Sequence, residues 1–206
     1  MKVVALKIIL VFCSVFCVSS IIAQNNWKLS KDKDGIKVFE SINDNSNYKS
    51  IKVECVMPGG VENLIRVLTD IDHHKDWIYN NKKAYLLKKL SADDFFYYTE
   101  TYLPWPLSNR DAVAHMKITR DTLNRFVDIV ETGEPGYIPQ KTGIVRVPRF
   151  AINWHVTVLP ASKLKVIYVL EVEPGGSIPA WLANMFVDKG PYESFKKLED
   201  ILKQQL

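Results

Sequence analysis

Histidines and cysteines are the side chains of this chain best suited to nucleophilic or metal chemistry, and their spacing is unfavourable for both. His73 and His74 are consecutive, so their side chains diverge, while His115 and His155 fall in separate strand-like segments. No His-x-x-x-His or Cys-x-x-Cys spacing occurs, so we predict no metal site and no cofactor. Residues 175–179 lack the Gly-x-Ser-x-Gly pattern of a nucleophile elbow. We therefore predict no catalytic residue. If the fold holds an acid or base in a pocket, His115 is the first candidate.

Arg110 and Asp111 are two adjacent charged residues at the start of a predicted strand. They close the most distinctive motif of the chain, at 103–111. Adjacent strand residues point to opposite faces, so these two side chains are not expected to pair with each other. We expect each one to tie the strand to a neighbouring loop or helix. The alternative is that Arg110 points inward and holds the head group of a ligand.

Residues 1–23 have the features of a signal peptide. Lys2 and Lys7 precede an apolar run at 8–18, and Ser19, Ser20 and Ala23 supply small residues near a cleavage point. The run is shorter than the roughly 20 apolar residues of a membrane span, although a retained anchor or a lipid-modified cysteine stays an alternative. We expect a single mature domain at 24–206 that is exported, either to the periplasm of a Gram-negative-like bacterium or out of the cell.

Charge and cysteine content narrow the classes of partner. The formal net charge of +4 is small and its lysines are scattered, which argues against nucleic acid and allows only a transient contact with a membrane surface. Once the leader with Cys13 and Cys17 is removed, Cys55 is the remaining cysteine, so no internal disulfide can form. Cys55 lies in an alternating apolar segment and is expected to be a buried structural thiol. We expect a monomer.

The elements that must position these residues follow from hydrophobic periodicity. The polar segment 27–34 is expected to be a short helix or a turn. Helical spacing occurs at 61–71, 73–79, 178–187 and 191–206. Alternating residues predict antiparallel strands at 36–42, 48–57, 84–90, 95–103, 110–119, 125–131, 143–159 and 165–173. An antiparallel sheet needs one face covered, and 191–206 is the long element left to cover it. The fold class is therefore α+β, with a curved antiparallel sheet around a C-terminal helix.

The inward faces of these strands carry more apolar surface than a thin core requires. Small and flexible residues share one face of 110–119, and aromatic and aliphatic residues share faces of the last two strands. Either the helices fill the space in front of them, or an apolar cavity remains there.

Three segments together resemble the START family of lipid-binding domains. They are LPWPLSNRD at 103–111, WHVTVLP at 154–160 and VIYVLEVEPGGSIPAW at 166–181. The resemblance implies a helix-grip fold from about Trp27 to Leu206, with a deep tunnel for a lipid or other hydrophobic ligand. It favours a cavity lined by Tyr97, Arg110, Ala112, Ala114, Met116, Trp154, Tyr168, Leu170, Trp181, Met185, Phe195 and Leu198.

The resemblance also limits the ligand. Sterol-transporting members of the family carry a buried acid–arginine pair at positions that match Tyr97 and Met116 here, so a strict sterol assignment is in doubt. The predicted function is non-catalytic binding, and transfer, of a hydrophobic ligand in a tunnel gated by the C-terminal helix. Trp181, Met185 and Phe186 are the predicted membrane contacts. The alternatives are a helix-grip enzyme, of cyclase or hydrolase type, acting on a hydrophobic cyclic substrate, and a module that signals to a partner when its lid closes.

Overall fold

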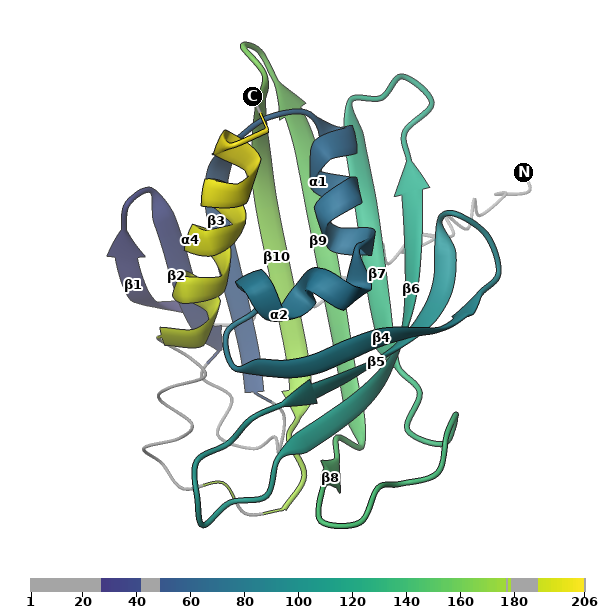
Figure 1. Cartoon of the computed structure of the whole chain (residues 1–206). Helices are drawn as coiled ribbons and strands as arrows, with labels where there is room; N and C mark the ends of the chain where they lie inside the picture. The colour runs from purple at the N-terminus through teal and green to yellow at the C-terminus, as the bar shows by residue number, and fades with distance from the viewer. Residues whose placement is uncertain (1–26, 42–48, 177, 179–188, 206) are drawn as a thin grey trace, which may run out of the picture.

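One curved antiparallel sheet and a C-terminal helix dominate the computed structural model, which describes residues 27–41, 49–176, 178 and 189–205 (Figure 1). The strand order is β1-β2-β3-β10-β9-β7-β6-β5-β4, and the short strand β8 pairs parallel with β6. The sheet curls so that β4 and β5 cross in front of β9 and β10 in Figure 1, and α4 and α1 lie across its concave side. The strands are β1 (Trp27–Lys33), β2 (Ile36–Ser41), β3 (Lys49–Pro58), β4 (Asn81–Lys89), β5 (Asp94–Thr101), β6 (Arg110–Arg120), β7 (Phe126–Gly133), β8 (Val145–Arg146), β9 (Arg149–Leu159) and β10 (Lys163–Glu173).

The helices cover the concave face of the sheet. They are α1 (Val61–Thr69), the 3₁₀ turn η1 (Ile71–His73), α2 (His74–Trp77) and α4 (Gly190–Lys203). Pro191 lies in the first turn of α4, where its missing N–H costs nothing, and Phe195, Leu198 and Leu202 repeat along the buried side of the helix. This arrangement confirms the α+β helix-grip prediction, and α4 packs against β2, β3 and α2.

Two predicted elements differ in the structure. The segment predicted as a helix or turn at 27–34 is strand β1, because it pairs antiparallel with β2 and gains cross-strand ion pairs such as Lys37–Asp32. The strand predicted at 143–159 is divided into β8 and β9, with Pro148, which has no N–H for a ladder, at the break. The helix predicted at 178–187 lies outside the described residues, apart from Ile178.

Along each strand, side chains alternate between the concave face of the sheet, which is buried, and the outer face, which is exposed. On β7, Val127, Ile129 and Glu131 are buried while Val130 is exposed. The inward set joins one apolar core with the helices, and this core includes Val38, Val53 and Leu198. Burial of such side chains is the main force that holds α4 against the sheet.

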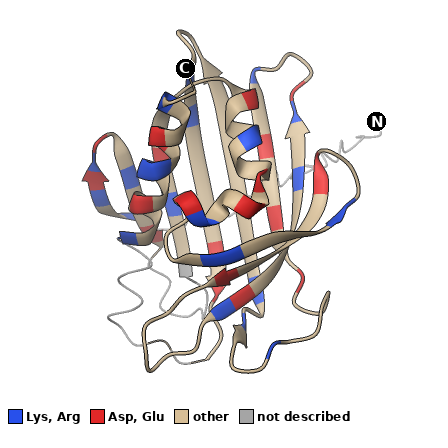
Figure 2. Ribbon diagram, viewed as in Figure 1, with Lys and Arg blue, Asp and Glu red and all other residues tan. Residues whose placement is uncertain are grey.

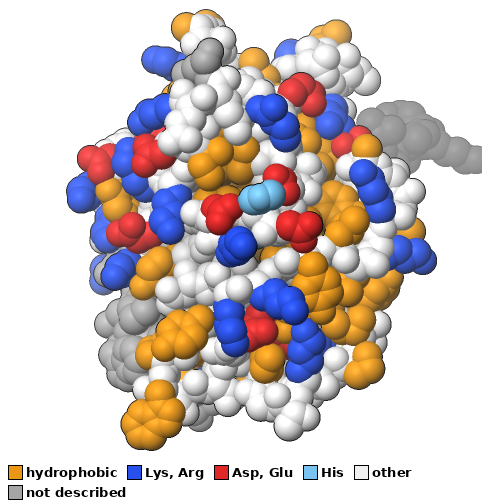
Figure 3. Space-filling model, viewed as in Figure 1, with side chains coloured by type: hydrophobic (Ala, Val, Ile, Leu, Met, Phe, Trp, Pro, Cys, Tyr) orange, Lys and Arg blue, Asp and Glu red, His pale blue; other side chains and the backbone are white. Residues whose placement is uncertain are grey.

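Acidic and basic residues are interspersed along the strands and helices (Figure 2). Five of the charged residues are buried, namely Glu100, Arg110, Asp111, Glu131 and Arg146. On the face seen in Figure 3, Lys and Arg side chains neighbour Asp and Glu side chains, with apolar side chains between them. No helix in the described part of the chain is both long and apolar enough to cross a membrane.

Candidate functional site

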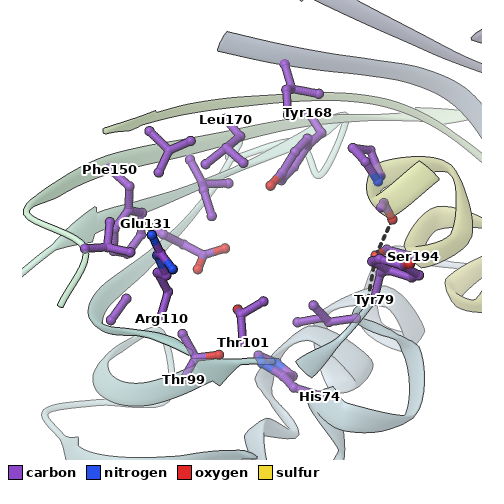
Figure 4. A pocket seen from close by; sticks show the side chains of 18 of the residues that line it. His74, Tyr79, Thr99, Thr101, Arg110, Glu131, Phe150, Tyr168, Leu170 and Ser194 are labelled. Atoms are coloured by element: carbon purple, nitrogen blue, oxygen red, sulfur yellow. Dashed lines mark hydrogen bonds between the residues drawn. The ribbon is translucent and has the colours of Figure 1, made fainter. Parts of the chain in front are cut away.

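An apolar cavity of about 370 Å³ lies between the concave face of the sheet and the helices α2 and α4 (Figure 4). Its wall comes from β5, β6, β9 and β10, whose inward residues alternate with outward ones, and its other side comes from the first turns of α4. Polar side chains are few among apolar ones. Those in the wall are His74, Tyr79, Tyr97, Thr99, Thr101, Arg110, Glu131, Tyr168 and Ser194.

Eight of the twelve predicted site residues line this cavity. They are Tyr97, Arg110, Ala112, Met116, Trp154, Tyr168, Leu170 and Phe195. Ala114 and Leu198 do not line it, because both have no exposed surface and are covered within the core. Trp181 and Met185 lie outside the described residues. The alternation along β5, β6, β9 and β10 therefore brings residues far apart in the sequence to one space.

Sequence analysis missed several wall residues, and Glu131 is the most important of them. Glu131 stands two residues after the buried Ile129 on β7, so its alternation with Val127 and Ile129 was the available signal. Thr99 and Thr101 follow Tyr97 on the same face of β5 and could have been found in the same way. A glutamate is not expected at an inward position of a strand, because buried glutamates are rare unless they are paired. The alternation alone therefore did not identify Glu131.

Glu131 is 4% exposed and is held by two neighbouring donors. The Tyr97 hydroxyl donates to its Oε2, and Trp154 Nε1 donates to its Oε1 at 3.2 Å. Burial raises the pKa of the Glu131 carboxyl, although both hydrogen bonds act to lower it. The site therefore favours a neutral, proton-carrying carboxyl at Glu131 more than water does.

Three aromatic rings pack together beside this carboxyl. The ring centroids of Trp154 and Tyr168 are 4.7 Å apart, and Phe195 on α4 lies 5.3 Å from each of them. Such contacts add to the energy of simple burial. They join α4 to the sheet across the cavity, so the position of α4 determines the shape of the aromatic wall.

A hydrogen bond also joins α4 to the segment after α2. The backbone N–H of Tyr79 donates to Ser194 Oγ at 2.9 Å, and Ser194 Oγ donates to the Gly190 carbonyl at 2.8 Å (Figure 4). All three residues line the cavity. We call these two hydrogen bonds the Ser194 latch. They join α4 to the segment on the opposite side of the cavity.

Asp111 and Arg146 form a buried ion pair outside the cavity. Arg146 Nε and Nη2 donate to the two carboxylate oxygens at 2.6 and 3.1 Å. Arg146 Nη1 also donates to the carbonyl oxygens of Pro135 and Ile138. Asp111 thus ties β6 to β8 and, through Arg146, to the loop before it. Arg110 also bonds carbonyls outside its strand, those of Ser108 and Gly175, so both members of the charged pair make the predicted kind of contact. Arg110 points to the other face, also as predicted, and lines the cavity.

Phe150 reaches the cavity because Gly133 has no side chain. A Cβ on Gly133 would lie 2.8 Å from the Phe150 ring, which is closer than real Cβ contacts. The ring therefore occupies the space that any other residue at position 133 would need, and it lines the cavity from there.

The histidines and Cys55 differ in their burial and in whether they line the cavity. His74 lines the cavity, and its Nε2 donates to the Leu68 carbonyl at 2.9 Å, while burial lowers the pKa of its ring. His115, the predicted first candidate for an acid or base, does not line the cavity but pairs with Asp94 at 2.6 Å. Cys55 is buried as predicted, and burial raises the pKa of its thiol to about 12. No group of metal-binding side chains occurs within the described ranges.

Comparison with known proteins assigns the fold to a family. The sequence profile of the START domain matches residues 21–205. The chain belongs to the START domain family. A STAR-related lipid transfer protein from Xanthomonas axonopodis has a similar structure, with a TM-score of 0.77 and 31% identity over 86% of this chain and 99% of that one. Human STARD10 shows the same START fold, with a TM-score of 0.74 and 20% identity over 86% of this chain and 73% of that one.

Two sequence relatives extend this START assignment. An uncharacterized protein of Pseudomonas aeruginosa is 32% identical over 200 residues, which cover 97% of this chain and 98% of that protein. Mouse phosphatidylcholine transfer protein is 27% identical over 169 residues, which cover 80% of this chain and 78% of that protein. The family resemblance seen in the three sequence motifs is confirmed.

Proposed function

We propose that this START domain binds a lipid without covalent chemistry and transfers it between membranes. The observation that carries the proposal is the apolar cavity between the sheet and α4. Burial of an acyl chain contributes about 0.8 kcal/mol for each methylene, so ten methylenes contribute about 8 kcal/mol before the costs of association. A wall with few polar groups can therefore bind a long chain and still release it at a membrane.

Phosphatidylcholine is the first ligand to test. Mouse phosphatidylcholine transfer protein, whose name states its ligand, is similar over most of both chains. A sterol is less favoured, because Tyr97 and Met116, which both line the cavity, stand where sterol-transporting members carry an acid–arginine pair. Native mass spectrometry of protein purified from its own cells, followed by organic extraction, should detect a bound lipid.

Filling the cavity tests the proposal directly. Leu170→Trp adds a large ring to the wall, whereas Val130→Trp adds the same ring to the outer face of β7. We expect Leu170→Trp to abolish transfer of fluorescent phosphatidylcholine between vesicles and Val130→Trp to transfer it like the parent. Equal transfer by both variants would show that the cavity does not carry the lipid.

We also propose that α4 is the lid of the cavity. Its support is the contact of Phe195 with the aromatic wall and the latch between Ser194 and Tyr79. In a Cys55→Ser background, a Tyr79→Cys, Ser194→Cys variant should cross-link α4 to the opposite wall. Transfer should stop when the variant is oxidised and return when it is reduced. Unchanged transfer in a fully oxidised sample would exclude this lid.

Export and membrane contact are proposed from the sequence. Mass spectrometry of the mature chain from cell fractions tests export, with cleavage after Ala23 as the expected result. A Trp181→Ala, Phe186→Ala variant tests the membrane contact, and it should bind vesicles and transfer lipid more weakly than the parent. A sedimentation experiment should give the mass of a monomer.

A further inference from the structure

The fold buries two arginines on the paired strands β6 and β8, and their surroundings differ in charge. Arg146 is 6% exposed and Arg110 is 8% exposed. Arg146 is matched by the Asp111 carboxylate, and this hydrogen-bonded contact raises its pKa. Arg110 has no carboxylate within salt-bridge distance among the described residues, and burial alone lowers its pKa. One buried cation is therefore neutralised by the protein and the other is not.

The hydrogen bonds of the Arg110 guanidinium group within the protein are incomplete and go to neutral carbonyls. Its Nη1 donates to the Ser108 carbonyl at 2.7 Å, and its Nη2 reaches the Gly175 carbonyl at 3.4 Å. Its Nε is buried and has no hydrogen-bond partner in the described structure. Figure 4 shows the side chain among those that line the cavity. The two carbonyls orient the guanidinium group but supply no negative charge to it.

Glu131 does not supply the negative charge for Arg110, although it lines the same cavity. Its two oxygens accept from Tyr97 and Trp154, and it forms no ion pair with Arg110. The strand register also separates the two backbones, because the partner of Glu131 on β6 is Met116, well along the strand from Arg110. A buried cation without a counter-charge is unfavourable, and an anion placed against it removes part of that cost.

We infer that Arg110 is a binding site for the anionic group of the ligand, a phosphate or a carboxylate, within the cavity. The guanidinium fork suits both anions, since each presents two oxygens to parallel N–H groups. The inference rests on the proposed lipid-binding function and adds a charge requirement to it. The apolar wall holds the chains, while Arg110 fixes the end of the molecule that carries the charge.

Matched ligands separate this charge from chain burial. Palmitate and hexadecanol test the carboxylate, and dipalmitoyl phosphatidate and dipalmitoylglycerol test the phosphate. Each is measured with ligand-free parent protein, Arg110→Gln and the control Arg125→Gln, which changes an arginine whose side chain is 67% exposed. Loss of a hydrogen bond to a charged group should weaken binding of the anionic member about 10- to 100-fold in Arg110→Gln. The neutral member should change less than the anionic one, and Arg125→Gln should behave like the parent.

The outcomes identify the anion or reject the site. A loss confined to phosphatidate identifies a phosphate site, a loss confined to palmitate a carboxylate site, and a loss for both a general anion site. Equal losses for anionic and neutral ligands would overturn the inference, because they indicate a structural role for Arg110. Unfolding curves of ligand-free Arg110→Gln check for that role, since relief of the unmatched buried charge should offset the loss of its hydrogen bonds to Ser108 and Gly175. If no lipid binds the parent at all, the proposed function itself fails.

Discussion

Replacing Asp111 with Asn should unfold this protein far more easily than its small change in shape suggests. Asp111 and Arg146 have side chains that are 1% and 2% exposed. Asn keeps one acceptor oxygen but places an N–H₂ group against an N–H of Arg146, so the buried guanidinium loses its counter-charge. Removing one partner of a buried pair typically costs about 3–5 kcal/mol. We expect a loss of that size in the free energy of unfolding.

Equilibrium urea unfolding of ligand-free protein, followed by tryptophan fluorescence, measures this loss. Asp32→Asn is the control, because its pair with Lys37 spans 3.8 Å and both side chains are about half exposed. Exposed pairs are worth about 0–1 kcal/mol. A loss for Asp111→Asn within about 1 kcal/mol of the control would refute the reasoning from burial.

A double variant separates the orphaned charge from the lost contact. Asp111→Leu with Arg146→Met removes both charges and should recover part of the stability lost by Asp111→Asn. Recovery should be incomplete, because Arg146 also donates to the carbonyls of Pro135 and Ile138. Faster hydrogen exchange in the loop at 134–144 should accompany both variants.

Three further predictions concern the cavity and its surroundings. Cys55, with its raised thiol pKa, should resist a thiol reagent at pH 8 in the chain without residues 1–23 and react fully in denaturant; fast labelling of the folded chain would contradict its burial. Because the pKa of Glu131 is raised by folding, its contribution to stability is fully present below the unfolded pKa and is lost as pH rises through the folded value. Glu131→Gln should therefore gain stability relative to the parent as pH rises from 4 to 8 in unfolding experiments, by about 1.4 kcal/mol for each unit of pKa shift; a difference independent of pH would contradict this. Ser194→Ala frees the Tyr79 N–H from its latch and should speed lipid transfer between vesicles about two- to tenfold, since a hydrogen bond contributes about 0.5–1.5 kcal/mol; slower transfer would count against the latch.

Most of the fold could be predicted from the sequence because alternation is a local property. Strands such as β6 and β10 show it plainly, and Pro160 and Pro174 flank β10. β1 (Trp27–Lys33) could not be predicted in this way, since it is mostly polar and becomes a strand by pairing with β2. The pairing of β3 with β10, which joins segments more than a hundred residues apart, leaves no local signal either.

The sequence predicts which face of a strand a residue occupies. It does not predict how far along that face the cavity extends. Ala112 and Ala114 share one face of β6, yet only Ala112 reaches the cavity. His73 and His74 are neighbours, and only the turn of α2 places His74 in the wall and His73 in solvent. The burial of Glu131 depends on hydrogen bonds from Tyr97 and Trp154, which come from other strands and leave no local signal near position 131.

Gly133 determines the volume available to a ligand without touching it. The Phe150 ring rests where a side chain at position 133 would otherwise stand. A methyl group at position 133 would clash with this ring, so the ring would have to move and the shape of the cavity beside it would change. A residue that does not itself line the cavity can thus alter the space available to a ligand, with every lining side chain unchanged in identity.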